Sequence, residues 1–157
     1  MVKEIRIYIE GGGDDRDTKR KIRQGFSGFL KNLVYIARNK RIKWDIIVCG
    51  SRNNAFRSFK NALEDYPDAF NMLLVDSEAA VNKLPWEHLK SRDNWDSSNV
   101  DDTHCHLMVQ AMEAMFIADI DTLKKFGSSV RCAKLSNLIA HKTCNTRTVA
   151  LKSLKTL

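Results

Sequence analysis

The chain has 157 residues, of which 43% are hydrophobic and 29% are charged, and its formal net charge is +7. This length predicts one domain with a substantial core, and no apolar stretch reaches the roughly 18 residues that cross a membrane. The amino end has the pattern of a strand and carries Glu4, unlike a signal peptide. We therefore expect a cytoplasmic protein with no membrane partner.

Apolar runs and helical periodicities alternate along the first half of the chain. Short apolar runs predict strands, and apolar residues that recur at helical spacing predict helices. Ser51 or Asn53 can cap the second helix. The expected elements are a strand at 3–9, a helix at 18–39, a strand at 44–49, a helix that ends near 63, and a strand at 70–75. This alternation predicts an α/β fold in which helices cover a mostly parallel sheet.

The second half is less regular. Residues 79–103 predict an ordered excursion with a short helix at 86–91. A helix is expected at 103–119, apolar except for a stripe formed by His106, Gln110 and Glu113. A short helix is expected at 120–126, and weaker helical signals follow at 134–140 and 148–157. We expect an α/β domain over residues 1–126 and a basic, helical extension of the same domain over 127–157.

Acidic residues end two of the predicted strands. Glu10 ends the first and precedes three glycines, and Asp76 and Glu78 end the third. The carboxyl edge of a parallel sheet is where such folds hold ligands, and alternate residues of an extended segment share a face. Carboxylates gathered there suit a hard divalent cation, although a solvated acidic loop has the same pattern. The glycines match neither a P-loop nor a dinucleotide fingerprint.

Basic residues are concentrated in two regions. Every charged residue between Arg16 and Lys43 is basic except Asp17, and no acid follows Asp121. Basic surfaces near an acidic site suit a polyanion such as DNA or RNA. Ordinary solvated helix faces explain any single lysine equally well, and the basic bias disfavours a small phosphorylated substrate.

The cysteines and tryptophans predict packing more than chemistry. None of the four cysteines forms a CxxC pair, so a structural zinc site is not expected. His104, Cys105 and His106 are adjacent and would point in different directions on a helix. Trp86 and Trp95 could stack on bases, but core packing is the favoured role.

These motifs together resemble the toprim fold, in which one strand ends in Glu-Gly and another in Asp-x-Asp or Asp-x-Glu. More closely, the chain resembles a small bacterial family of toprim-like domains of unknown function over about residues 3–126. The segments that carry this resemblance are 7–14, 48–53, 74–78, 85–89 and 106–114. Members are similar to proteins found beside an ATPase in phage-defence modules.

The resemblance implies a Rossmann-like sheet of about four strands and a nuclease that depends on Mg²⁺ or Mn²⁺, related to the overcoming-lysogenization-defect type nucleases. Glu10 would be metal ligand or general base, Asp76 and Glu78 the metal-binding pair, and Glu113 an additional catalytic carboxylate. The chain departs from the commoner pattern in having Glu rather than Asp at 78.

Around these acids, the resemblance and the charge pattern suggest further roles. Asp14, His106 and Gln110 would surround the metal ligands, and Lys19, Arg20, Arg23 and Arg52 would face the phosphates of DNA or RNA. The sequence is also compatible with a non-catalytic, nucleic-acid-binding or regulatory subunit of an ATPase complex, with a phosphoryl-transfer enzyme, and with a homo-oligomer.

Overall fold

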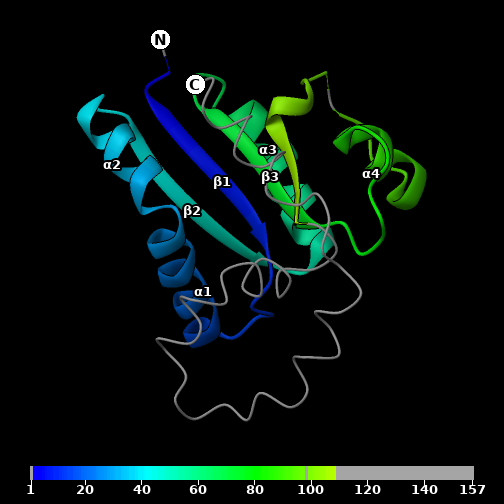
Figure 1. The fold of residues 1–157 in the computed structure, drawn as a ribbon, viewed down its shortest axis with the longest axis horizontal. Helices are drawn as coiled ribbons and strands as arrows, with labels where there is room; N and C mark the ends of the chain where they lie inside the picture. Colours follow the sequence, from blue (N-terminus) through cyan, green and yellow to red (C-terminus); the bar gives the residue numbers. More distant parts are fainter. Residues whose placement is uncertain (1, 98, 109–157) are drawn as a thin grey trace.

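A four-stranded, all-parallel sheet forms the centre of the protein (Figure 1). The computed structural model describes residues 2–97 and 99–108. Within them the strand order is β2-β1-β3-β4. The strands are β1 Glu4–Glu10, β2 Lys43–Gly50, β3 Phe70–Asp76 and β4 Cys105–Met108. The predicted α/β class and the parallel sheet of about four strands are confirmed.

Helices cover both faces of the sheet. After β1 come α1 and α2, after β2 comes α3, and after β3 come α4 and a short 3-10 turn, η1. Their bounds are α1 Arg16–Phe29, α2 Lys31–Asn39, α3 Arg52–Asp65, α4 Pro85–Asp93 and η1 Asp102–His104. Ser51 caps α3 as predicted, because its hydroxyl accepts the Asn54 backbone N–H at 3.3 Å.

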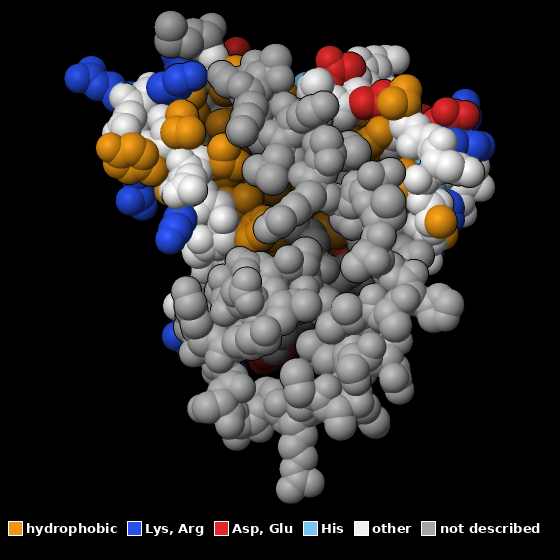
Figure 2. Space-filling model, in the orientation of Figure 1, with side chains coloured by type: hydrophobic (Ala, Val, Ile, Leu, Met, Phe, Trp, Pro, Cys, Tyr) orange, Lys and Arg blue, Asp and Glu red, His pale blue; other side chains and the backbone are white. Residues whose placement is uncertain are grey.

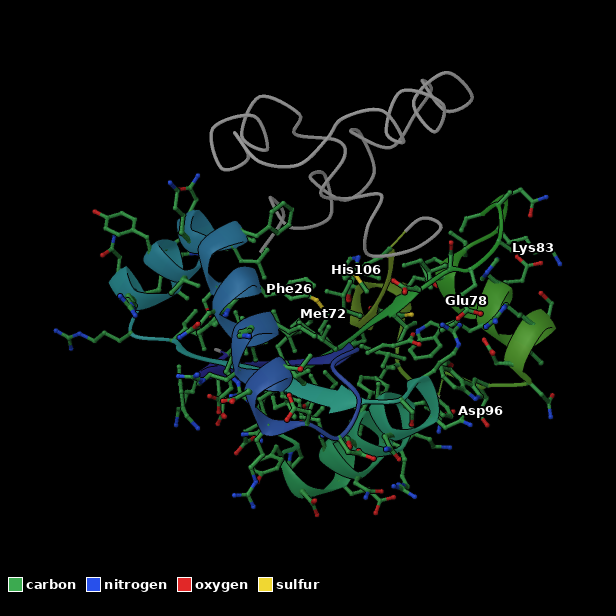
Figure 3. The ribbon with its side chains drawn as sticks, turned by 90° about the horizontal axis from the view of Figure 1, so that it is seen from below. Phe26, Met72, Glu78, Lys83, Asp96 and His106 are labelled. Carbon is green, nitrogen blue, oxygen red and sulfur yellow. The ribbon has the colours of Figure 1, made fainter. Side chains whose placement is uncertain are left out.

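The two faces of the sheet belong to separate apolar cores. On one face Phe26 of α1 packs with Met72 of β3, and Figure 3 shows these two side chains close together. On the other face Phe59 of α3 packs with Leu73 of β3 and with Leu89 of α4. Because successive strand residues alternate between these cores, the central strands read as continuous apolar runs in the sequence.

The helix predicted at 18–39 is two helices. α1 ends at Phe29 and α2 begins at Lys31, with Leu30 between them at φ −91° and ψ 13°. The non-helical residue changes the angular phase of the second helix relative to the first. Two large apolar residues of these helices lie on the surface: Phe29, the last residue of α1, is 59% exposed, and Ile36 of α2 is 49% exposed.

The helix predicted to begin at 103 is also wrong where the structure describes it. Asp102–His104 form η1, and Cys105–Met108 form β4, which pairs with β3. An apolar segment buried on both sides suits a strand between two cores as well as a helix, so periodicity alone does not separate them. The rest of that helix and the extension at 127–157 lie outside the described residues.

The excursion between β3 and β4 is ordered by its aromatic residues, which confirms their predicted packing role. Trp86 and Trp95 are both buried, and the Trp95 ring stacks on Phe56 of α3 at a centroid distance of 4.2 Å. The indole N–H of Trp86 donates to the carbonyl of Asp101 at 2.9 Å. Among the described residues, no helix is long and apolar enough to span a membrane.

Candidate functional site at the carboxyl edge of the sheet

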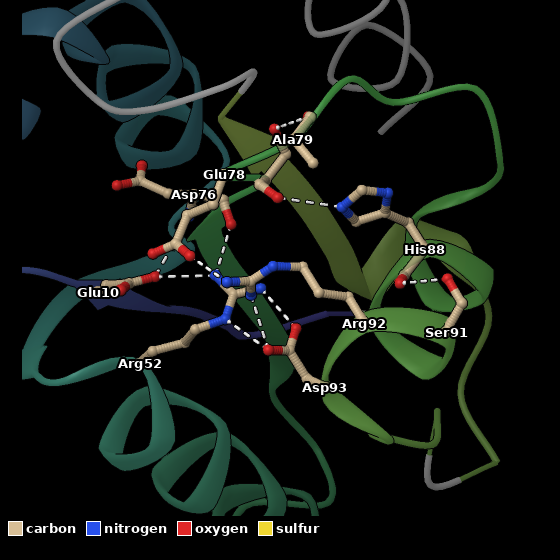
Figure 4. Close-up of polar contacts among 10 residues, drawn as sticks. Glu10, Arg52, Asp76, Glu78, Ala79, His88, Ser91, Arg92 and Asp93 are labelled. Atoms are coloured by element: carbon tan, nitrogen blue, oxygen red, sulfur yellow. Dashed lines mark hydrogen bonds and ion pairs between the residues drawn. The ribbon is translucent and has the colours of Figure 1, made fainter.

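Glu10 and Asp76 emerge side by side from neighbouring parallel strands. β1 and β3 are paired with Ile9 opposite Leu74, so Asp76 lies one residue beyond the level of Glu10. The backbone N–H of Asp76 donates to Oε2 of Glu10 at 3.3 Å (Figure 4). The sheet topology therefore brings together the two acids that the sequence placed at separate strand ends.

A glycine contact fixes the loop that follows Glu10. The N–H of Gly11 donates to the carbonyl of Gly50 at 2.7 Å, which ties the end of β1 to the end of β2. Gly50 has φ +85°, and a Cβ there would lie 2.6 Å from the carbonyl oxygen of Gly13. Only glycine allows so close an approach of the two backbones without strain. This contact places Glu10 at the sheet edge.

Arg52, the first residue of α3, lies between the two acidic strand ends. Its Nη1 donates to Oε2 of Glu10 at 3.2 Å and to the backbone carbonyl of Asp76 at 2.5 Å. Only 12% of its side chain is exposed. The predicted phosphate-facing arginine is thus engaged with protein carboxylate and backbone oxygens.

Asp93, at the end of α4, holds the other side of the Arg52 guanidinium. Nε and Nη2 of Arg52 donate to Oδ1 and Oδ2 of Asp93 at 3.2 and 2.7 Å, a bidentate pair. Burial by itself would raise the pKa of Asp93, but the hydrogen bonds and charge of Arg52 outweigh it and lower that pKa. Burial likewise disfavours the charge of Arg52, yet Asp93 raises the pKa of the guanidinium.

Glu78 does not continue the line of β3. The strand ends at Asp76, and Glu78 has φ +51°, a left-handed conformation. The buried Ser77 between them donates its N–H to the carbonyl of Met108, and His88 Nε2 lies 3.1 Å from the Ser77 carbonyl oxygen. The expectation that Asp76 and Glu78 share one face of an extended segment is therefore wrong. Glu78 instead accepts a hydrogen bond from Nη2 of Arg92.

The carboxylate of Asp76 lies on the opposite side of the sheet from Arg52. Leu74 packs against the core on the α1 face, and strand alternation puts Asp76 on that same face. Figure 4 shows the Asp76 carboxylate directed away from the Arg52 guanidinium. Over residues 2–97 and 99–108, no three Asp, Glu, His or Cys side chains are grouped so that they could hold a metal ion.

The remaining predicted site residues are dispersed. Asp14 is almost fully exposed on the glycine loop, 3.9 Å from Nζ of Lys19. His106 lies on β4 with its side chain on the α1 face, where burial lowers the pKa of the imidazole. Gln110 and Glu113 lie outside the described residues. The two residues before His106 point elsewhere. Nδ1 of His104 lies 2.6 Å from the Asn71 carbonyl oxygen, and Cys105 is buried in the core on the α3 face.

The basic residues of α1 differ in what they contact. Arg23 donates from Nε to the carbonyl of Ile46 at 3.0 Å, whereas Arg20 pairs on the surface with Asp17 at 3.3 Å. Figure 2 shows Lys and Arg side chains along the edge of the molecule that α1 and α2 form. These exposed positions can meet a polyanion without breaking a buried contact.

Sequence reasoning did not single out Asp93 or Arg92. The signal that could have found them is weak: an adjacent Arg-Asp pair at the end of a predicted short helix. Asp93 gains its role only from Arg52, 41 residues earlier in the chain.

The fold and the edge together define a class: a Rossmann-like α/β domain in which two neighbouring parallel strands end in acidic residues, Glu10 and Asp76, and an arginine binds the carboxylate of the first and the backbone of the second. A family model described as "Domain of unknown function (DUF4276)" matches residues 9–143. The chain belongs to this family. No curated protein and no solved structure matches it significantly.

Proposed function

We propose that the protein is a toprim-type nuclease that hydrolyses phosphodiester bonds with a divalent cation, Mg²⁺ or Mn²⁺. The observation that carries the proposal is the junction of Glu10 and Asp76 at the carboxyl ends of adjacent parallel strands. Ligands of open parallel sheets bind at this edge. A toprim relationship would also explain why the first acid is followed by glycines that hold it in place.

The donor set suits an open cation site rather than a closed cage. Mg²⁺ keeps several waters and is usually bound by one or two carboxylates together with substrate phosphates. Glu10 would supply one carboxylate, Asp76 a second if its side chain turns at the strand end from the α1 face toward Glu10, and Glu78 a third if it leaves Arg92. A cation there would polarise the phosphodiester and activate water.

The protein's own groups would then orient the reaction. Both Glu10 contacts described above are made by Oε2, and they fix the orientation of the carboxylate. The position of the other oxygen, Oε1, is therefore fixed as well. In this proposal Glu10 binds the cation or accepts the proton of the attacking water. Asp93 raises the pKa of Arg52 and keeps it charged, and Arg52 holds the Glu10 carboxylate in position. Lys19 and Arg20, at the start of α1, would meet the phosphates beyond the site.

We further propose that the substrate is DNA or RNA and that the nuclease acts in phage defence. The basic bias of the chain favours DNA or RNA over a small phosphate ester. A role as the cytoplasmic effector of a phage-defence module, beside an ATPase partner, would fit a nuclease whose activity must be restrained until infection.

Cleavage of DNA and RNA by the purified protein tests this function. We expect cleavage with Mn²⁺, none with chelator, and a loss of at least about 100-fold in Glu10→Gln, since a general base contributes about 10²–10⁴-fold. Glu64→Gln is the matched control, because Glu64 is exposed at the far end of α3. Absence of cleavage by the wild type, or equal cleavage by Glu10→Gln, would rule the proposal out.

A second candidate is a non-catalytic module that binds nucleic acid or regulates an ATPase. The observation in its favour is that Arg52 forms an ion pair with Glu10 at the sheet edge. Such a module would bind no Mn²⁺, and Asp76→Asn would not change its thermal stability in the presence of metal.

A further inference from the structure

Two ion pairs at the sheet edge differ in their burial. The side chains of Arg52 and Asp93 are 12% and 14% exposed, and their pairing is bidentate. The side chains of Arg92 and Glu78 are 31% and 46% exposed. Breaking a buried pair strands a charge, whereas an exposed pair contributes only about 0–1 kcal/mol. The Arg92–Glu78 pair is therefore the one that another anion can replace.

Arg92 has a second contact that would survive such a replacement. Its Nη1 donates to Oδ1 of Asp93 at 2.7 Å, and Asp93 is itself held by Arg52. If Glu78 leaves, Asp93 still directs the guanidinium toward the sheet edge, with Nη2 available to an incoming group. Figure 4 shows Arg92 and Arg52 converging on Asp93 beside the acidic strand ends. A planar guanidinium fits phosphate oxygens with paired hydrogen bonds.

We propose that Arg92 binds a backbone phosphate of the nucleic acid and that Glu78 masks it by occupying the same donor when no nucleic acid is bound. The inference rests on the proposed function, since it assigns a substrate contact to the same edge. It also gives Glu78 a role that does not require a metal: an intramolecular competitor for the phosphate.

The competition predicts opposite effects of the two substitutions. With a fluorescent 20-nucleotide single-stranded DNA, and separately RNA, in chelator, we expect Glu78→Gln to bind roughly two- to fivefold more tightly than wild type, the factor that an exposed pair of up to about 1 kcal/mol can supply. Arg92→Gln should bind more weakly, with the salt slope of log K reduced by about 0.7 for the lost phosphate contact. Anisotropy measures both.

Two controls separate competition from general electrostatics. Glu87→Gln makes the same charge change on α4, at an exposed residue 3.8 Å from Lys83, and should tighten binding less than Glu78→Gln. In the double variant Glu78→Gln/Arg92→Gln, the gain from Glu78→Gln over Arg92→Gln should fall to no more than that of Glu87→Gln, because the rest of its effect acts through Arg92. Circular dichroism of each variant checks that the fold is retained.

The proposal is overturned if Glu78→Gln binds no more tightly than Glu87→Gln, if its gain beyond that of Glu87→Gln persists without Arg92, or if neither wild type nor Glu78→Gln binds either oligonucleotide. Because chelator prevents turnover, the result is independent of the cleavage assay. Cleavage with Mn²⁺ but no Glu78 effect would reject this inference alone. A Glu78 effect without cleavage would reject the nuclease and leave the phosphate contact standing.

Discussion

At the scale of single residues, Arg52 determines how the acidic edge is organised. One guanidinium contacts the carboxylates of Glu10 and Asp93 and the backbone of Asp76, and so links β1, β3 and α4. Its ring neighbour is Trp95, with the guanidinium carbon 5.1 Å from the ring centroid. The hydrogen-bond donors of Arg52 are thus used within the protein, so its role is to hold these elements together rather than to bind an external ligand.

Replacing Arg52 should therefore be costly. Arg52→Met would leave Glu10, whose side chain is 17% exposed, without its arginine, and would leave Asp93, 14% exposed, with only the more exposed Arg92. We expect a loss of about 3 kcal/mol in the free energy of unfolding, as for other broken buried pairs. Chemical denaturation measures it. Arg92→Met is the matched control and should cost less than about 1 kcal/mol, as an exposed pair does; equal losses in the two variants would contradict the assigned roles.

At the scale of elements, the contact between the glycine loop and the end of β2 positions Glu10. The left-handed Gly50 faces the carbonyl of Gly13 across that contact. A side chain at Gly50 would push the loop, and Glu10 with it, away from the neighbouring strand.

Gly50→Ala tests this contact. The positive φ and the 2.6 Å approach should reduce the free energy of unfolding by about 1–3 kcal/mol or more. Gly25→Ala is the control of opposite sign: Gly25 lies in α1 with open space around its Cα, and alanine there should stabilise by about 0.5–1 kcal/mol. Thermal or chemical unfolding gives both values. A neutral Gly50→Ala would show that the loop is not held by this approach.

Most helices and strands of the described residues could be predicted from the sequence, but the end of α1 and the strand β4 could not. The elements β1, β2, β3 and α3 follow from strong apolar runs and helical periodicity, and α4 matches the short helix expected at 86–91 within the polar excursion. The end of α1 does not, because Leu30 is neither glycine nor proline and carries no local signal for a break. The described part of β4, Cys105–Met108, is apolar except for His106 and shows no alternation of polar and apolar residues, so its pattern equally favoured a helix.

In the candidate site, the sequence predicts the positions that follow from the sheet topology. It does not predict the positions that depend on which side chains pair with each other. A parallel sheet necessarily brings Glu10 and Asp76 to one edge. The direction of Glu78 depends on its left-handed backbone and on Arg92, 14 residues later. The bidentate pair of Arg52 with Asp93 depends on how α4 packs on the sheet, which no local pattern encodes.

At the scale of the whole molecule, basic and acidic side chains are gathered in different places. Figure 2 shows Lys and Arg along the edge formed by α1 and α2 and Asp and Glu on the other side of the same view, while Glu10, Arg52 and Asp93 meet at the carboxyl edge of the sheet. A basic edge attracts a polyanion, and carboxylates at the sheet edge need a bound cation or an arginine beside them before a phosphate can approach. This arrangement suits a nuclease whose cation and substrate bind together.

The central claim is that Glu10 and Asp76 bind a divalent cation, and calorimetric titration with Mn²⁺ tests it most directly. The account predicts that wild type binds Mn²⁺, that Glu10→Gln and Asp76→Asn each weaken binding at least about tenfold, equivalent to about 1.4 kcal/mol, and that the exposed controls Glu64→Gln and Asp68→Asn bind as wild type does. Absence of Mn²⁺ binding by wild type, or unchanged binding by Glu10→Gln and Asp76→Asn, would contradict it.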